Sequence, residues 1–269
     1  MNKGYQRWIE DNLEIVNKEG ELVKFQLNPI QTKFLTKDTT NGKDIILKAR
    51  QQGFSSMILA IFTADFILKE NTYNVVVADD ADNAQGLLKR VKDYLTGWAD
   101  KKGLEVSDLL KYNSKYELYM PHNNSTYVIG TAQNVNFGRS KTITNLHLSE
   151  AAFYPHLREI LKGALQAVVP SGRAIIETTA NGFNEFKTYW DDTTLGETPF
   201  KALFYPAQDF YDEEFLDAKR MELGRDFMQE YPSSPLEAFL TSGETYFSKE
   251  ALQYYLEHTR EPVEKKEYV

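Results

Sequence analysis

A glycine-containing segment with two basic residues lies between an apolar run and a second, longer apolar run of this sequence. It reads Lys-Ala-Arg-Gln-Gln-Gly-Phe-Ser-Ser, from Lys48 to Ser56. Gly53 permits a tight backbone turn, and the amide groups that open a following helix attract an anion. A hydroxyl such as that of Ser55 can bind Mg²⁺ beside a phosphate. The segment therefore predicts a loop that binds the phosphates of a nucleotide.

This loop departs from the standard pattern G-x-x-x-x-G-K-[ST] at two positions. Lys48 replaces the first Gly, and Phe54 replaces the usual Lys. The positive charge that a triphosphate requires can come from Lys48 or from Arg50 instead. The expected nucleotide-binding positions of the loop are Lys48, Arg50, Gln51, Gln52, Gly53, Phe54, Ser55 and Ser56. Taken alone, the segment also fits a strand-to-helix turn with solvated basic side chains.

A second candidate group, Ser149 and Glu150, stands at the end of the predicted strand 142–148. A carboxylate at a strand end beside a phosphate loop is where an ATPase holds its attacking water and the shell of its Mg²⁺. We expect Glu150 to polarise the water. Ser149 stands where an Asp is usual, so it can make only a neutral, indirect contact with the metal. The predicted metal site is therefore Ser55, Ser149 and Glu150, and a helix-capping Ser-Glu pair is the alternative.

Two further polar groups complete the candidate site. Thr178 and Thr179 end another apolar run, where their hydroxyls can sense a γ-phosphate. Gln31 precedes the first predicted strand of the sheet, and its amide can both donate to and accept from the edge of adenine.

These groups require a sheet whose strands end at a common edge. Short β-rich runs alternate with helical stretches, which predicts a mainly parallel sheet flanked by helices. The expected strands are 45–47, 74–78, 142–148 and 173–178, and an antiparallel hairpin is expected at 116–120 and 125–129. We predict an α/β core with an N-terminal extension at 1–204, a small, mainly helical subdomain at 205–259 and a charged tail at 260–269.

Composition narrows the possible functions. The 269 residues contain 31 Lys and Arg against 39 Asp and Glu, a net charge of −8, so any contact with nucleic acid must be local. The absence of Cys excludes a disulfide framework, a cysteine nucleophile and a thiolate zinc site. The apolar run 57–68 is too short to cross a bilayer, and the N-terminus lacks the pattern of a signal peptide. We expect a soluble, intracellular protein without a membrane partner.

The order of these motifs resembles the ATPase domain of the large terminase subunit, the DNA-packaging motor of tailed bacteriophages. Residues 48–55 resemble that family's deviant Walker A loop, 146–153 its Walker B segment and 178–182 its coupling motif. The segments 138–140 and 229–239 are similar to the family as well. The resemblance covers roughly residues 25–245.

The resemblance implies a P-loop NTPase of the ASCE type, with ATP and Mg²⁺ as its cofactors. In this interpretation Gln31 faces adenine, Lys48 and Arg50 neutralise the β- and γ-phosphates, and Ser55 ligates magnesium. Glu150 is the catalytic carboxylate, and Thr178 with Thr179 is the coupling element. Arg139 is a candidate arginine finger that acts in its own site or in that of a neighbouring subunit.

The resemblance also implies an ATP hydrolase that moves double-stranded DNA into a procapsid, in the host cell cytoplasm during virus assembly. Its expected partners are the portal protein, the small terminase subunit and further copies of the chain in a ring. The residues after the matched portion are too few for a nuclease domain, so no nuclease activity is expected. A helicase-like remodelling ATPase and a non-hydrolytic DNA-binding scaffold are the alternatives.

Overall fold

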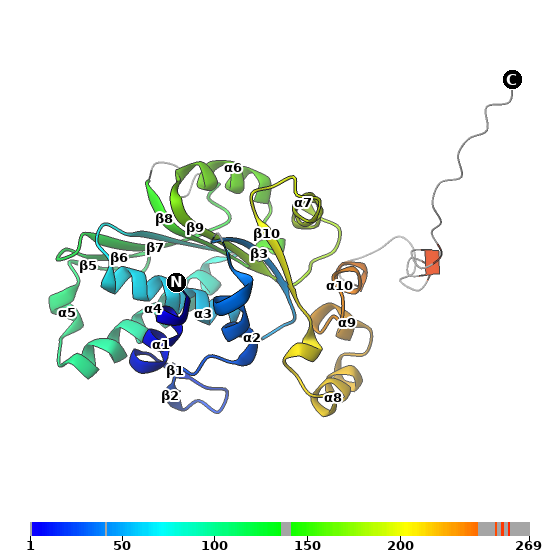
Figure 1. Ribbon diagram of the computed structural model, residues 1–269, viewed down its shortest axis with the longest axis horizontal. Coiled ribbons are helices and arrows are strands. Elements are labelled where there is room, and N and C mark those ends of the chain that lie inside the picture. The colour runs from blue at the N-terminus through cyan, green and yellow to red at the C-terminus, as the bar shows by residue number, and fades with distance from the viewer. Residues whose placement is uncertain are drawn as a thin grey trace, which may run out of the picture.

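A long mixed sheet with helices on both faces forms the centre of the molecule (Figure 1). The structure is a computed structural model that describes residues 2–40, 42–135 and 141–241, together with 251, 254, 255 and 258. Within these residues the sheet has eight strands in the order β10-β3-β9-β8-β4-β7-β6-β5, and β1 and β2 form a separate antiparallel pair.

The strands are β1 (Glu14–Val16), β2 (Leu22–Lys24), β3 (Lys43–Lys48), β4 (Tyr73–Ala78), β5 (Tyr112–Asn113), β6 (Glu117–Met120), β7 (Ser125–Thr131), β8 (Ile143–Ser149), β9 (Val168–Thr178) and β10 (Lys201–Tyr205). The α-helices are α1 (Asn2–Asn12), α2 (Pro29–Lys33), α3 (Phe54–Leu68), α4 (Ala81–Lys102), α5 (Val106–Leu109), α6 (Leu157–Ala167), α7 (Glu185–Thr194), α8 (Glu213–Leu223), α9 (Phe227–Glu230) and α10 (Pro235–Thr241).

The six strands from β10 to β7 pair in parallel, and β6 and β5 continue the sheet antiparallel. This arrangement confirms the mainly parallel sheet and the hairpin that the sequence predicts. Successive residues of a strand point to opposite faces, so Ile46 packs with α1, α3 and α4, whereas Ile45 and Leu47 pack with α6 and α7. Each face of the sheet thereby carries its own hydrophobic core.

Helix α3, which follows the predicted phosphate loop, is buried along most of its length. It is apolar on all sides because it lies between the sheet and the helices α1 and α4 (Figure 1). Among the described residues, no helix combines the length and the apolar character that crossing a bilayer would require. A buried helix of this kind fixes the position of the loop that precedes it.

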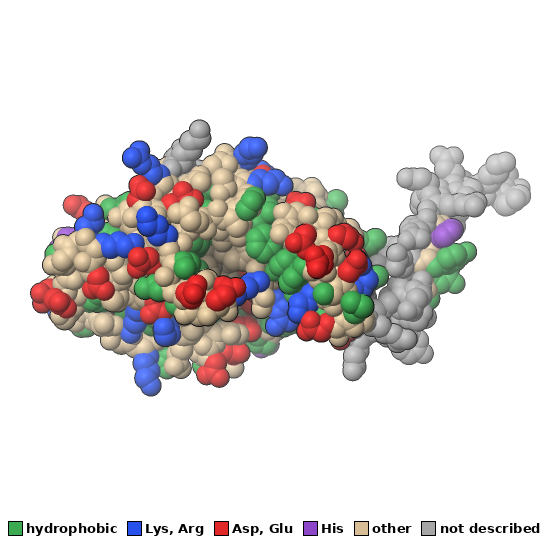
Figure 2. Space-filling view, turned by 90° about the horizontal axis from the view of Figure 1, so that it is seen from below, with side chains coloured by type: hydrophobic (Ala, Val, Ile, Leu, Met, Phe, Trp, Pro, Cys, Tyr) green, Lys and Arg blue, Asp and Glu red, His purple; other side chains and the backbone are tan. Residues whose placement is uncertain are grey.

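Beyond the sheet, the described chain continues as the C-terminal lobe, which we define as residues 207–241. It contains α8, α9 and α10 and lies to one side of the sheet (Figure 1). Seen from below, a hollow separates the lobe from the α/β body, and acidic and basic side chains are interspersed on this face (Figure 2). The lobe's small core, which includes Leu216, Phe227 and Tyr231, also contacts Ala49 of the loop.

No strand is predicted from the sequence at residues 201–205, yet they form β10 and pair in parallel with β3. The strand closes the sheet on the side of the C-terminal lobe (Figure 1). The domain boundaries at 204 and 259 stay predictions, and the tail 260–269 lies outside the described residues.

Candidate active site

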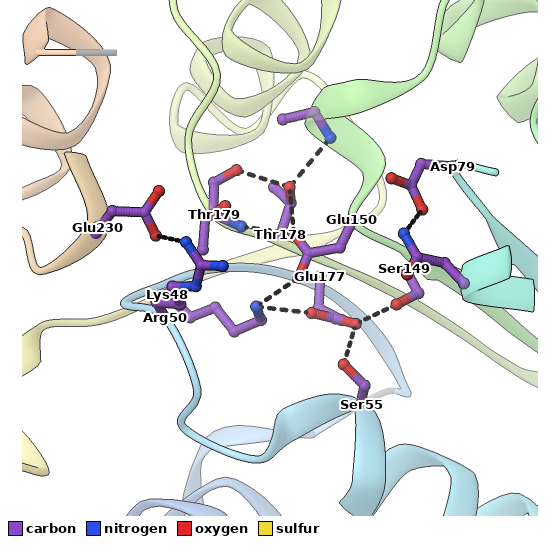
Figure 3. Close-up of polar contacts among 12 residues, drawn as sticks. Lys48, Arg50, Ser55, Asp79, Ser149, Glu150, Glu177, Thr178, Thr179 and Glu230 are labelled. Atoms are coloured by element: carbon purple, nitrogen blue, oxygen red, sulfur yellow. Dashed lines mark hydrogen bonds and ion pairs between the residues drawn. The ribbon is translucent and has the colours of Figure 1, made fainter. Parts of the chain in front are cut away.

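The carboxyl ends of β3, β9 and β8 meet at one edge of the sheet, and side chains from all three contact one another there (Figure 3). The strand register places Leu47 beside Thr178 and Ser149 beside Glu177. Parallel strands present their carboxyl ends on the same side, which is where ligands bind in open α/β sheets. Residues that are far apart in the sequence therefore share one site.

Lys48, the last residue of β3, carries the central positive charge of this site. Its Nζ lies 3.0 Å from Glu150 Oε1 and 3.2 Å from Glu177 Oε2, and only 5% of its side chain is exposed. Burial by itself disfavours the ammonium, but attraction by Glu177 and Glu150 outweighs burial and raises the pKa of Lys48 above its usual value. The lysine therefore stays charged and is held by two carboxylates.

Glu177 is a member of the site that sequence analysis leaves out. Its side chain is fully buried, and Oε1 accepts hydrogen bonds from Ser55 Oγ at 2.8 Å and Ser149 Oγ at 2.7 Å. Burial alone would raise its pKa, but Lys48 and the neighbouring hydrogen-bonding groups lower it, so Glu177 is ionised. The signal in the sequence is a charged residue directly after the apolar run 174–176.

Glu150 follows β8 in a left-handed backbone conformation, with φ 56° and ψ 46°. Such a conformation is uncommon for a residue other than glycine and occurs often at functional sites. Its Oε2 accepts a hydrogen bond from the Thr179 N–H at 3.2 Å and from Thr178 Oγ1 at 3.3 Å. The side chain is 31% exposed. The predicted coupling residues thus hold a carboxylate that also reaches solvent.

The loop turns sharply at Gly53, directly before α3 begins. Gly53 has φ +79°, and a Cβ there would lie 2.7 Å from Gln31 Nε2. Gln51 also has a positive φ, of 57°. The close approach of the Gln31 amide and the left-handed backbone both explain why the turn needs glycine.

Two predicted loop positions point away from the shared site. The ring of Phe54 is 1% exposed and packs edge-on against Phe34, within the hydrophobic core. Phe54 can therefore serve the loop only through its backbone, and its contact with nucleotide stays a prediction. Ser56 Oγ accepts a hydrogen bond from Arg90 Nη1 at 3.1 Å. Ser55 is therefore the loop hydroxyl that faces the carboxylates.

Gln31 supports the loop in this structure. Its Oε1 accepts from the Asn28 N–H at 2.9 Å, and its Nε2 donates to the Gly53 carbonyl at 2.7 Å. Asn28 Oδ1 in turn accepts from the Gln31 N–H, which makes a capping box at the start of α2. The amide is 3% exposed. The contact of Gln31 with adenine stays a prediction.

Arg50 connects the loop to the C-terminal lobe, and Gln52 connects it to Pro206, directly before the lobe. Arg50 Nη1 lies 3.0 Å from Glu230 Oε2, and the Arg50 N–H donates to the Glu230 carbonyl at 2.9 Å. The Tyr211 hydroxyl donates to the Arg50 carbonyl at 2.9 Å. Gln52 is buried, and its Nε2 donates to the Pro206 carbonyl at 2.9 Å. The Arg50 side chain is 58% exposed, so it faces the lobe rather than the carboxylates.

The structure thus brings together Lys48, Ser55, Ser149, Glu150, Thr178 and Thr179. It places Arg50 on the lobe side of the same loop. Arg139, the candidate arginine finger, lies outside the described residues.

A parallel sheet with a glycine turn and strand-end acids defines a P-loop-like α/β protein, and solved structures share this fold. The ATPase domain of the large terminase of Thermus phage P74-26 matches with a TM-score of 0.61 and 18% identity, over 77% of this chain and 93% of that one. The large terminase of bacteriophage HK97 matches with a TM-score of 0.64 and 17% identity, over 89% of this chain and 56% of that one.

A third similar structure is a large terminase from a thermophilic bacteriophage in complex with ATP-gamma-S. It has a TM-score of 0.51 and 13% identity, and the match covers 75% of this chain and 50% of that one. No family sequence model and no curated protein sequence match the chain. At these identities the similarity establishes the fold, which is that of phage large-terminase ATPase domains.

Proposed function

We propose that this chain is the ATP-hydrolysing motor domain of a phage large terminase, which moves double-stranded DNA into a procapsid. The observation that carries the proposal is the contact between Lys48 of the loop and Glu150 of the neighbouring strand end, at 3.0 Å. In this proposal Lys48 binds the phosphates and Glu150 primes the water, and their contact supports a shared site for both roles. The fold of phage terminase ATPase domains and the ATP-gamma-S complex of one of them support the same activity.

Binding of ATP exchanges the partners of the basic residues. The triphosphate carries more negative charge than one carboxylate, so Lys48 moves from Glu150 toward the phosphates, and Arg50 supplies a second charge. Glu150 is then free to accept a hydrogen bond from the attacking water. The hydrogen bonds from Thr178 and Thr179 hold this carboxylate in place and transmit its displacement to β9.

The residues present fit a magnesium ion. Ser55 and Ser149 both donate to one oxygen of a buried carboxylate, so hydroxyl and carboxylate oxygens converge, and Mg²⁺ prefers such ligands together with phosphate oxygens. With ATP bound, Ser55, Ser149 and Glu150 would hold the ion. Bound magnesium stabilises the charge that develops on the phosphates during water attack.

Movement of DNA requires further partners. We propose that a few Lys and Arg side chains grip the DNA phosphates without reading sequence. Copies of the chain would form a ring at the portal protein of the procapsid, with Arg139 contributing to a nucleotide site and the small terminase subunit delivering DNA. Assembly of the virus places this activity in the host cytoplasm.

ATP turnover by site variants tests the proposal. Glu150→Gln and Lys48→Ala are each expected to lower the rate of ATP hydrolysis about 100-fold or more. The matched controls are Glu214→Gln and Lys102→Ala, which change exposed residues of α8 and α4 and should leave the rate unchanged. Unchanged rates in both site variants would show that this site does not hydrolyse ATP, which is the outcome expected of a non-hydrolytic scaffold. Hydrolysis coupled to strand separation, without procapsid-dependent DNA uptake, would support a helicase.

A further inference from the structure

The predicted magnesium site contains a carboxylate from β9, although β8 itself ends in Ser149 rather than in an acid. Ser149 stands where the acid of β8 is expected, and its neighbour across the sheet is Glu177 of β9. Glu177 Oε1 accepts hydrogen bonds from Ser149 Oγ at 2.7 Å and from Ser55 Oγ at 2.8 Å. The two hydroxyls predicted to serve the metal therefore converge on one oxygen of one buried acid (Figure 3).

We propose that Glu177 is the principal acid of the magnesium site and performs the role that a carboxylate at position 149 would perform. The inference rests on the proposed function and names the residue that would hold the metal which this function requires. The strand that carries Glu177 lies between β3 and β8 in the sheet, so its end faces the loop on one side and Glu150 on the other. A rigid central strand positions a metal-binding group more precisely than a loop does.

The charges around Glu177 favour a divalent cation. Lys48 Nζ is 3.2 Å from Glu177 Oε2 and 3.0 Å from Glu150 Oε1, so one ammonium faces two carboxylates. Glu177 Oε2 is buried and makes no hydrogen bond to a described residue, although it takes part in this ion pair. When Lys48 moves to the phosphates of ATP, Glu177 loses the ammonium at Oε2 and keeps the contacts at Oε1, which include His147 Nε2 at 3.2 Å. A magnesium ion bound with the nucleotide would supply positive charge beside Glu177 in place of the ammonium.

The alternative is that Glu177 only stabilises the fold, as one half of a buried ion pair. The two roles predict different effects when a second acid is introduced next to position 177. A carboxylate placed at position 149 by Ser149→Asp would lie on the neighbouring strand end, in register with position 177. It can restore a metal site there. A Glu177→Gln/Ser149→Asp double variant therefore separates metal binding from a purely structural role.

The experiment measures the affinity for a fluorescent, non-hydrolysable ATP analogue in MgCl₂ and in EDTA. We define the magnesium-dependent gain in affinity as the dissociation constant in EDTA divided by the dissociation constant in MgCl₂. Glu177→Gln is expected to reduce this gain about tenfold or more, and Ser149→Asp in the same chain is expected to restore most of it. The matched control is Asp44→Asn, which changes another fully buried carboxylate, at the opposite end of β3, and should keep the gain.

A second variant covers the case in which Glu177→Gln does not fold. Glu177→Asp keeps a charge for Lys48 and shortens the side chain by one methylene. It is expected to stay folded and to lose several-fold of the magnesium-dependent gain. The melting temperature of each variant, measured without nucleotide, reports whether the fold is intact.

Three results would overturn the inference. The first is a full magnesium-dependent gain in folded Glu177→Gln or Glu177→Asp protein. The second is a loss of the magnesium-dependent gain in Glu177→Gln that Ser149→Asp fails to restore, when the melting temperatures of both the single and the double variant have also fallen. The third is a wild-type chain that binds no nucleotide in either buffer, which would overturn the proposed function as well and is thereby distinguished from the first two.

Discussion

Lys48 Nζ lies 3.0 Å from Glu150 Oε1, so the first basic residue of the loop is paired with an acid 102 positions further along the chain. The proposed mechanism needs these two groups to separate when nucleotide binds. The ion pair therefore competes with ATP for the lysine. A change that weakens the pair without removing Lys48 should reveal this competition.

The first prediction concerns nucleotide affinity in Glu150→Gln. The variant keeps the acceptor for the Thr179 N–H but removes one of the two charges that hold Lys48. Its affinity for ATP-gamma-S is expected to be unchanged or several-fold higher than that of the wild type, while hydrolysis is lost. Equilibrium titration with a fluorescent analogue measures this affinity. A folded variant that fails to bind nucleotide would show that Glu150 holds the site together rather than competing with ATP.

The second prediction concerns the ion pair between Arg50 and Glu230. Both side chains are partly exposed, at 58% and 21%, so the pair contributes about 1 kcal/mol or less to stability. Glu230→Gln frees the guanidinium for the phosphates. We expect a melting temperature within about 2 °C of the wild type and a nucleotide affinity about three- to tenfold higher.

Its control is the double variant Arg50→Ala/Glu230→Gln, compared with Arg50→Ala alone. The gain from Glu230→Gln should disappear when Arg50 is absent, because the freed guanidinium causes it. An equal gain in both backgrounds would show that Glu230 acts on the site by another route.

The third prediction tests the glycine turn. Gly53→Ala introduces a Cβ 2.7 Å from Gln31 Nε2 at a residue with φ +79°, so we expect a loss of about 1–3 kcal/mol in the free energy of unfolding. Gly86→Ala is the matched control, since Gly86 lies within α4 and a Cβ there meets nothing within 4 Å. It should stabilise the protein by about 0.5–1 kcal/mol. Urea denaturation measures both changes, and equal effects would contradict the strained turn.

Much of the sheet was predictable because its central strands are buried on both faces. The runs around Ile46 and Val76 are continuously apolar, and such runs identify strands covered by helices on each side. The strand around Leu146 is interrupted by Asn145 and His147, which are themselves buried. β10 was missed although residues 202–205 are apolar, because this short run comes where the sequence changes to mainly helical stretches. It lies at one edge of the sheet, and four of its five residues are only partly buried.

Residues of the candidate site were predictable when they belong to a recognisable local motif. Residues whose contacts depend on the order of the strands in the sheet were not. Lys48, Ser55 and Glu150 stand in recognisable local patterns. In the sequence, Glu177 is only a charged residue near the end of a strand. Its partner Ser55 is 122 positions away, and the two side chains come together only because of the order of the strands in the sheet. The sequence pattern also does not show that the Phe54 side chain turns into the core.

The fourth prediction concerns Asp44, which lies near the start of β3 and is fully buried. Burial raises its pKa from 3.8 to about 6, although Thr39 and Lys201 oppose the shift. Between these two pH values the folded protein holds a proton that the unfolded chain has lost. The stability contributed by Asp44 is therefore greatest below about pH 4 and falls as the pH rises through 6.

Asp44→Asn removes this ionisation, so its free energy of unfolding relative to the wild type should rise by up to about 3 kcal/mol between pH 4 and pH 7. Thr39→Val gives a second check, because the Thr39 hydroxyl donates to Asp44 Oδ2 at 2.5 Å and lowers its pKa. Loss of that hydrogen bond should move the fall in stability to a higher pH. Urea denaturation across this pH range measures both effects. A difference between Asp44→Asn and the wild type that stays constant with pH would show that Asp44 ionises alike in the folded and unfolded chains.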